Sequence, residues 1–225
     1  MPGCHFVISK NVLTQELYYK NQVILTYTIY YPRFLSKDNM LILDQINAYY
    51  STKAMIYINK NIMNLYQEAM VDYEYSVINQ FPLRQYEVYV DFNVTFNLSC
   101  ILSLYFDCYE YRGGAHGSTI RTSDSWDIFC SRPITLMNLF PPHTNIKEYY
   151  INAIIEQIRH EVQNGSSLYF DDYENLVKQY LSLSNFYLTY DGVVIYFQQY
   201  EIAPYATGIP EFLIPYSKEG ASLPR

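Results

Sequence analysis

Apolar and polar residues alternate most clearly in the middle of the chain, from Tyr86 to Ser99 (YEVYVDFNVTFNLS). One face of this segment is apolar and comprises Tyr86, Val88, Val90, Phe92, Val94, Phe96 and Leu98, whereas the other carries Glu87, Tyr89, Asp91, Asn93, Thr95 and Asn97. Because successive side chains of a strand point to opposite faces, this pattern predicts a long strand in an antiparallel sheet covered on one side. Cys100–Arg112 and Gly117–Cys130 predict two further strands, joined by short turns into a meander.

A helical period precedes this strand. Apolar residues recur at steps of three and four at Leu41, Ile42, Ile46, Tyr49 and Tyr50, and again at Ile58, Ile62, Leu65, Tyr66 and Ala69. The spacing predicts a helix from an N-cap at Asp38 to about Ile78, either as one long helix or as two helices broken near Ser51-Thr52. Before it, the β-branched and aromatic segment Val23–Tyr31 predicts a strand, followed by Pro32, which lacks a backbone donor.

The C-terminal half mixes helix and strand signals. Asn145–Gln163 predicts a helix closed by Asn164-Gly165, with an apolar stripe of Tyr149, Tyr150, Ile154, Ile155, Ile158 and Val162. The acidic segment Asp172–Tyr180 predicts a shorter helix. Two strands, Phe186–Tyr190 and Val193–Gln198, flank the hairpin signal Asp191-Gly192, and Glu211–Tyr216 predicts the last strand.

Runs of strands interrupted by helices predict an α+β fold. We expect antiparallel sheets packed by one long N-terminal helix and by one helix in the C-terminal half. A boundary near Arg112–His116 would divide the chain into an N-terminal subdomain at residues 14–110 and a C-terminal subdomain at residues 111–217.

The amino-acid composition argues against several classes of binding partner. The 225 residues carry a net charge of −7, and no basic run exceeds two residues, which argues against nucleic acid and against an electrostatic grip on anionic lipid. The 27 tyrosines suit half-buried strands or binding surfaces for sugars and proteins. No apolar run is long enough to span a bilayer, and the first residues, MPGCHFVISKNVLTQ, do not form a signal peptide.

The four cysteines, Cys4, Cys100, Cys108 and Cys130, contain no Cys-x-x-Cys pair, which argues against a zinc ribbon. A disulfide between Cys108 and Cys130 on neighbouring strands and isolated buried thiols are both compatible with the sequence. We expect no metal and no cofactor, because neither His-Glu-x-x-His nor Gly-x-Ser-x-Gly is present.

The segment Tyr111–Gly117 (YRGGAHG) is the first candidate site. Gly113 and Gly114 suit a tight turn with positive φ. His116 then has two interpretations, as a hydrogen-bonded residue that fixes the hairpin or as a general base or metal ligand. A zinc site would require further ligands, for which His143, His160 and Cys130 are the candidates.

The segment Tyr200–Gly208 is the second candidate site. Pro204 restricts φ, and Gly208 permits a turn. Glu201 stands alone in an apolar stretch, where it could bind backbone donors or pair with Arg112 or His116. The segment is either structural or part of a surface that enters a partner's cleft. Acid pairs such as Asp171-Asp172 are more typical of solvated or capping groups than of a glycosidase.

Several of these segments carry a family resemblance. Tyr111, Gly113, Gly114, Ala115, His116 and Gly117 resemble a Tyr-x-Gly-Gly-Ala-His-Gly motif, Ile134–Phe140 is similar to the segment that follows it, with Asn138 in place of the usual aspartate, and Phe186–Tyr190 and Tyr196–Ser217 resemble the closing strands. Together they resemble a family of domains of unknown function that is shared by the extracellular region of the RsiV anti-sigma factor and by PdaC-type peptidoglycan deacetylases. The preceding segment, Val23–Ser99, resembles the companion N-terminal domain.

The resemblance implies an extracytoplasmic role in the cell envelope, with lysozyme or a cell-wall glycan as partner. Our leading hypothesis is a non-catalytic binding or sensing module with binding residues Tyr111, His116, Glu201, Pro204 and Tyr205 and structural turns at Gly113, Gly114, Gly117 and Gly208. The alternatives are an accessory or hydrolytic domain acting on wall polysaccharide, with His116 and Glu201 as its chemical groups, and a purely structural or oligomerisation module.

Overall fold

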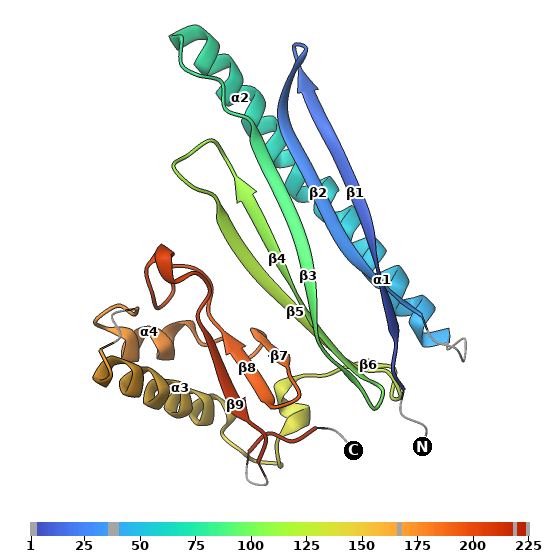
Figure 1. Ribbon diagram of the computed structural model, residues 1–225, viewed down its shortest axis with the longest axis vertical. Helices are drawn as coiled ribbons and strands as arrows, with labels where there is room; N and C mark the ends of the chain where they lie inside the picture. Colours follow the sequence, from blue (N-terminus) through green and yellow to red (C-terminus); the bar gives the residue numbers. More distant parts are fainter. Residues whose placement is uncertain (1–3, 36–40, 166–167, 218–219, 224–225) are drawn as a thin grey trace. The chain divides into compact units, whose positions relative to one another are not determined.

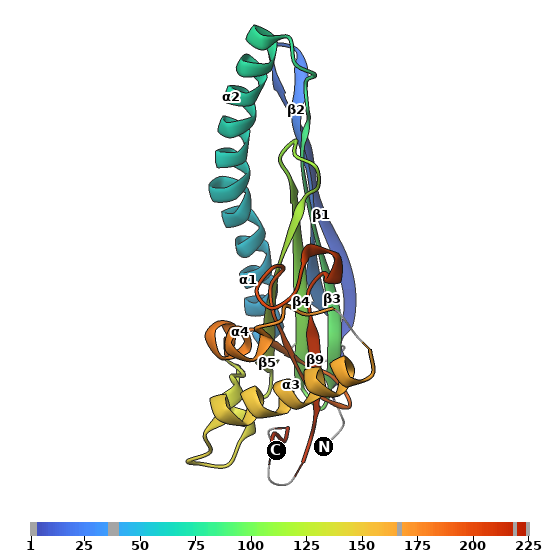
Figure 2. The ribbon, with the colours of Figure 1, turned by 90° about the vertical axis from the view of Figure 1, so that its left-hand side faces the viewer.

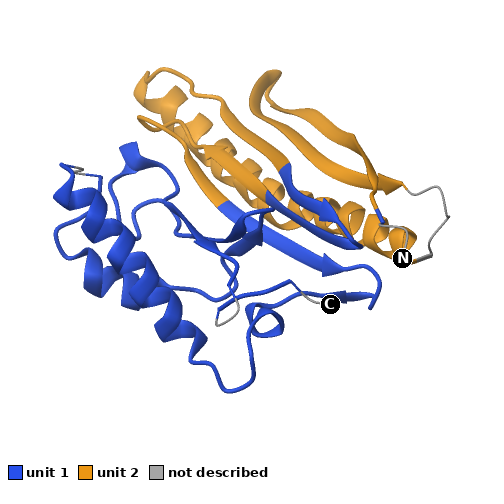
Figure 3. Cartoon of the chain, turned by 60° about the horizontal axis from the view of Figure 1, so that its bottom comes forward, with its two compact units in different colours: residues 1–4, 93–105, 121–225 blue, residues 5–92, 106–120 orange. Residues whose placement is uncertain are grey.

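The computed structural model describes residues 4–35, 41–165, 168–217 and 220–223. Its strands form a six-stranded sheet in the order β1-β2-β3-β4-β5-β6 and a three-stranded sheet in the order β7-β8-β9 (Figure 1). The predicted α+β class with mostly antiparallel sheets is confirmed. The chain divides into two compact units (Figure 3): residues 5–92 and 106–120 form what we call the N-terminal unit, and residues 1–4, 93–105 and 121–225 form the C-terminal unit.

A long hairpin opens the N-terminal unit. β1 (Val7–Tyr19) pairs antiparallel with β2 (Gln22–Leu35), and Lys20 and Asn21 form the turn with positive φ angles. β2 was predicted, but Pro32 lies inside it, opposite Lys10, and does not follow it. The parallel pairing of β2 with β3 covers only Leu25–Ile29, so a residue without a backbone donor is tolerated further along.

One long helix covers a face of this hairpin (Figure 2). It runs as α1 (Leu41–Tyr57), a π-helical segment η1 (Ile58–Ile62) and α2 (Met63–Asn79), and ends at Gln80 with φ +55°. The expected N-cap, Asp38, lies outside the described residues. Of the two alternatives, one long helix or two helices broken near Ser51-Thr52, the structure has the long helix, and its one irregularity in the described range falls at η1.

The spacing of the apolar residues explains the position of the π segment. Tyr50, Ala54, Ile58 and Ile62 are each four residues apart, and all are at least half buried. An α-helix has 3.6 residues per turn, so a repeat of four drifts around the helix axis. The wider π turn compensates for the drift and keeps the next buried residues, Leu65 and Ala69, on the covered face.

The predicted meander is present as β3 (Tyr86–Leu98), β4 (Ile101–Tyr111) and β5 (Ser118–Asp127), followed by the short β6 (Arg132–Pro133). Alternation holds at the start of β3, where Tyr86, Val88 and Val90 are buried. It fails at the other end, where Asn97 is buried and Leu98 is exposed. Phe96 and Asn97 point to opposite faces there and are both buried, so alternation no longer marks a single covered face.

The C-terminal unit has its own core. It contains a 3₁₀ turn η2 (Leu136–Leu139), α3 (Ile146–Gln163), α4 (Tyr173–Tyr180), β7 (Phe186–Leu188), β8 (Gly192–Tyr196), a 3₁₀ turn η3 (Tyr205–Thr207) and β9 (Glu211–Pro215). Asn145 caps α3 by accepting a hydrogen bond from Glu148 N–H. The α3 stripe packs in this core as predicted, except that Val162 is exposed near the end of the helix.

The cysteine pairing differs from the pairing considered from the sequence. Cys4 forms a disulfide with Cys100, 96 positions away, whereas Cys108 is a half-buried thiol and Cys130 an exposed one. The alternative of a disulfide between Cys108 and Cys130 is therefore wrong. The alternative of isolated thiols is confirmed, although Cys130 is exposed and not buried. Ser99 and Cys100 both have positive φ in the β3–β4 turn, and this turn brings Cys100 beside Cys4. Within the described residues, no helix combines the length and apolar character needed to cross a membrane.

Candidate functional site

The glycine-rich turn at residues 112–117 joins β4 to β5 in the N-terminal unit. Gly113 has φ +74°, and its carbonyl accepts a hydrogen bond from Arg84 Nη1. The Tyr111 hydroxyl donates to the carbonyl of Gly114 at 3.1 Å. The turn is six residues long, and only Gly113 of the glycine pair uses the left-handed region.

Gly117 has a different role, which is to leave room for a neighbouring ring. A Cβ atom at this position would lie 2.4 Å from Cε2 of Tyr109, so the missing side chain makes room for the tyrosine ring. His116 is exposed, and its Nδ1 lies 3.1 Å from the carbonyl oxygen of Gly117. No three His, Cys, Asp or Glu side chains among the described residues are arranged to hold a metal ion. These contacts of His116, Gly113 and Gly117 support a structural role for the three residues in the turn.

The second candidate, which we call the aromatic loop, comprises residues 199–209 between β8 and β9 of the C-terminal unit (Figure 1). Gln198 fixes its first end, because the carboxamide accepts from Arg121 N–H at 2.9 Å and donates to the Arg121 carbonyl at 2.8 Å. Glu201 Oε2 in turn accepts from Gln198 N–H at 2.7 Å. The lone glutamate therefore binds a backbone donor, one of the roles expected for it, whereas Arg112 pairs with Glu68 and Glu110.

Further contacts hold the middle of the aromatic loop. Ile202 and Ala203 are buried in the core of the C-terminal unit, and the Ile202 carbonyl accepts from Phe170 N–H at 3.1 Å. The Thr207 hydroxyl donates to the Leu168 carbonyl at 2.8 Å. Gly208 has φ +77°, as its proposed turn role requires. The backbone of the aromatic loop is thus anchored at several points.

Two tyrosine rings lie next to each other on this anchored backbone. The rings of Tyr200 and Tyr205 lie 5.8 Å apart with an interplanar angle of 30°. Tyr200 is 53% exposed, and Pro204 beside Tyr205 is also exposed. Tyr200 has φ +67°, a conformation that is uncommon for residues other than glycine and that is often found at functional sites. The loop thus places two tyrosine rings side by side on an anchored backbone, with Tyr200 exposed and Tyr205 half buried.

A buried arginine lies beneath the aromatic loop. Arg121 on β5 stacks its guanidinium 3.8 Å from the ring centroid of Tyr105 and forms an ion pair with Glu211 on β9. Arg121 and Gln198 were not among the sequence-derived site residues, and Tyr200 opened the second candidate segment without being named as a binding residue. The only signal was a single arginine among small polar residues of a strand, which is equally typical of an exposed position.

The candidate acid is partly desolvated. Burial raises the pKa of the Glu201 carboxyl above its ordinary value, although the hydrogen bond from Gln198 N–H opposes the shift. His116 belongs to the N-terminal unit, whereas Glu201 belongs to the C-terminal unit. Each is hydrogen-bonded within its own unit, to Gly117 and to Gln198 respectively.

Comparison with known families divides the chain into two segments. Residues 19–119 match the family model described as "Deacetylase PdaC", and residues 137–217 match the model described as "Protein of unknown function (DUF3298)". The resemblance inferred from the sequence is confirmed for these two families, whereas the link to the RsiV anti-sigma factor is not shown by these matches. The Tyr111–Gly117 turn lies in the first segment and the aromatic loop in the second.

Solved structures share this fold. A DUF3298 family member from Bacteroides fragilis has 19% sequence identity and a TM-score of 0.71, with 95% of this chain and 91% of that chain covered. A DUF3298 family protein from Pseudomonas aeruginosa has 18% identity and a TM-score of 0.58, with 93% and 91% covered. No curated protein matches the chain at a significant level. At these identities the likeness establishes the fold alone.

Proposed function

From a chain that carries a PdaC-type segment followed by a DUF3298 segment, we propose a non-catalytic binding module of the cell envelope. Its aromatic loop docks into the cleft of a protein partner, and lysozyme is the partner to test first. The observation that carries the proposal is the pair of neighbouring rings on an anchored backbone, the exposed Tyr200 and the half-buried Tyr205.

Physical arguments favour this surface for protein recognition. Tyrosines are enriched among the few interface residues that contribute most of the binding free energy. A loop that is already ordered loses little conformational entropy on binding. The net charge of −7 favours a basic partner, because opposite charges speed the encounter of two proteins and complement each other across the interface.

The disulfide supports a location outside the cytoplasm. Disulfides such as Cys4–Cys100 form and persist in oxidising compartments, whereas cytosolic thiols are kept reduced. The same compartment would contain lysozyme and cell-wall glycan. The hydrolase alternative has less support, because His116 and Glu201 each bond a backbone group of their own unit.

Isothermal titration calorimetry with lysozyme, and separately with muropeptides, tests the proposal. We expect lysozyme to bind and the Y200A/Y205A double variant to weaken binding roughly thirty-fold or more, the effect of losing a major interface anchor. Tyr190→Ala is the matched control, because Tyr190 is an exposed tyrosine of the same unit in the β7–β8 turn.

Two results would count against the proposal. One is the absence of any heat change with lysozyme at high micromolar concentration. The other is an equal loss of affinity in the double variant and in the Tyr190 control, which would place the interface elsewhere. Binding of muropeptides in place of lysozyme would move the assignment to the glycan alternative.

A further inference from the structure

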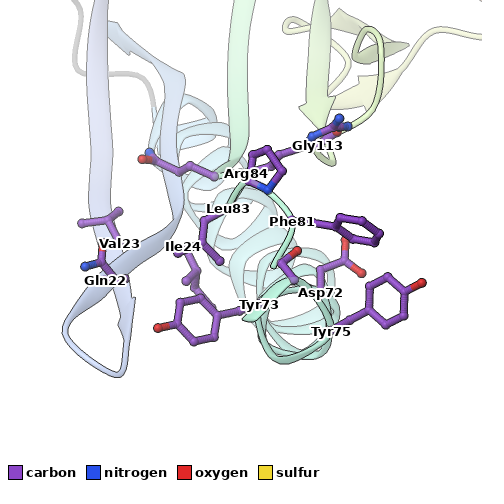
Figure 4. Close-up of a pocket in the computed structure, with 13 residues that line it drawn as sticks. Gln22, Val23, Ile24, Asp72, Tyr73, Tyr75, Phe81, Leu83, Arg84 and Gly113 are labelled. Carbon is purple, nitrogen blue, oxygen red and sulfur yellow. The ribbon is translucent and has the colours of Figure 1, made fainter. Parts of the chain in front are cut away.

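A cavity of about 600 Å³ lies at one end of the N-terminal unit (Figure 4). Its walls come from four places: the start of β2, the last turns of α2, residues 81–85 before β3, and Gly113 of the turn between β4 and β5. The volume is in the range of pockets that hold small ligands. None of the residues considered above for the aromatic loop lines this cavity.

The apolar part of the wall is unusually exposed. Tyr75 is 59% exposed and Phe81 is 55% exposed, and their ring centroids lie 5.9 Å apart. Leu83, also exposed, and Tyr73 line the same cavity. Large apolar side chains that gather on a surface commonly mark a binding site, because leaving them in water is unfavourable.

Polar side chains make up much of the remaining wall, namely Gln22, Asp72, Ser76, Arg84 and Gln85. The most strongly polar groups are held in place by the fold. The Asp72 carboxylate accepts a hydrogen bond from the Tyr86 hydroxyl, and Arg84 donates to the Gly113 carbonyl. A carboxylate has about four acceptor sites and a guanidinium five donors, so both groups retain capacity for a ligand.

The composition of the wall excludes several ligand classes. The charges of its one carboxylate and one guanidinium cancel, and a wall without net charge disfavours a strongly anionic or cationic ligand. The many hydrogen-bonding groups disfavour a purely apolar ligand such as an acyl chain, because they would be buried unpaired. What remains is a neutral ligand with an apolar face and many hydroxyl or amide groups.

We propose that this cavity binds a neutral saccharide. The C–H face of a pyranose ring packs on Tyr75 and Phe81, and the ring hydroxyls bond to Asp72, Arg84 and the glutamine carboxamides. Amide and carboxylate groups suit this role, because sugar hydroxyls both donate and accept hydrogen bonds. The site is separate from the protein-binding role proposed for the aromatic loop, since it consists only of residues of the N-terminal unit.

Titration of the whole chain with chitotetraose and with cellotetraose tests the proposal, by calorimetry and by NMR chemical-shift changes. We expect millimolar or tighter binding of at least one of them. Tyr75→Ala and Phe81→Ala should each weaken it tenfold or more, which corresponds to about 1.4 kcal/mol. Because both side chains are largely exposed, neither variant should affect folding.

Ile78→Ala is the matched control. Ile78 is 76% exposed on α2 beside these residues but does not line the cavity, so its loss should leave saccharide affinity unchanged. Failure of both tetrasaccharides to bind at millimolar concentration would overturn the proposal, as would binding that persists in the Tyr75 and Phe81 variants. Lysozyme titrations of the same variants separate the two sites, because these substitutions should not alter binding by the aromatic loop.

Discussion

Removal of the Cys4–Cys100 disulfide should destabilise the protein strongly. The two cysteines are 96 positions apart, so the bond closes a long loop of the unfolded chain. For a loop of this length the chain-entropy model gives about 4.7 kcal/mol at 25 °C. Whole domains are stable by only about 5–15 kcal/mol, so this loss is a large part of the total.

Urea unfolding of the C4S/C100S double variant measures the effect. The intrinsic fluorescence of Trp126, the only tryptophan of the chain, can follow the transition. We expect the free energy of unfolding to fall by several kcal/mol relative to the oxidised parent. Cys130→Ser is the control, because Cys130 is an exposed thiol outside any disulfide and its replacement should change little.

A thiol count gives an independent check. In denaturant, the oxidised protein should expose two reactive thiols, Cys108 and Cys130, and the reduced protein should expose all four. A count of four before reduction would refute the pairing. A double variant as stable as the Cys130 control would instead refute the loop-closure argument.

Three further predictions concern single side chains. Gly117→Ala should lower stability by about 1–3 kcal/mol in urea titrations, because the new Cβ would lie 2.4 Å from Cε2 of Tyr109; an unchanged midpoint would refute the packing argument. Tyr150→Phe should raise stability by about 1 kcal/mol, because the buried Tyr150 hydroxyl has no hydrogen-bond partner among the described residues; destabilisation would indicate a partner. Glu201→Gln should reduce the pH dependence of stability. Since the pKa of Glu201 is raised, the folded state binds more protons than the unfolded state between the ordinary carboxyl pKa and the raised one, and the free energy of unfolding falls as pH rises through that window. Urea titrations across that range should show this fall in the parent and a smaller one in the variant, and equal slopes would contradict the assignment.

Periodicity predicted those elements that bury one face. The alternation at the start of β3 and the stripe on α3 correspond to buried side chains, since both elements pack against a core on one side only. β1 has no counterpart among the sequence-based expectations, because it lies at the edge of its sheet and buries no clear face. The four-residue spacing of the apolar residues before the π segment is visible in the sequence, but which of these residues are buried depends on the packing of the helix against the hairpin.

The candidate sites were predictable only in part. The roles of Gly113 and Gly208 follow from chain geometry, and both adopt the positive φ expected of a turn glycine. The contact of Arg121 with Gln198 joins residues 77 positions apart, so no local pattern indicates it. The pairing of Tyr200 with Tyr205 is local, but it depends on the conformation that the loop adopts between β8 and β9. The cavity beside Tyr75 and Phe81 likewise combines segments that are distant in sequence.

The chain enters each compact unit more than once, because residues 93–105 belong to the C-terminal unit and residues 106–120 to the N-terminal unit. A single cut in the gene at any position between residues 92 and 121 therefore assigns part of one unit to the wrong fragment. Separate expression of the two halves should therefore give poorly folded products. To express one unit alone, its separate chain segments would have to be joined by a linker. Because the two units are interleaved along the chain, binding is best measured on the whole chain.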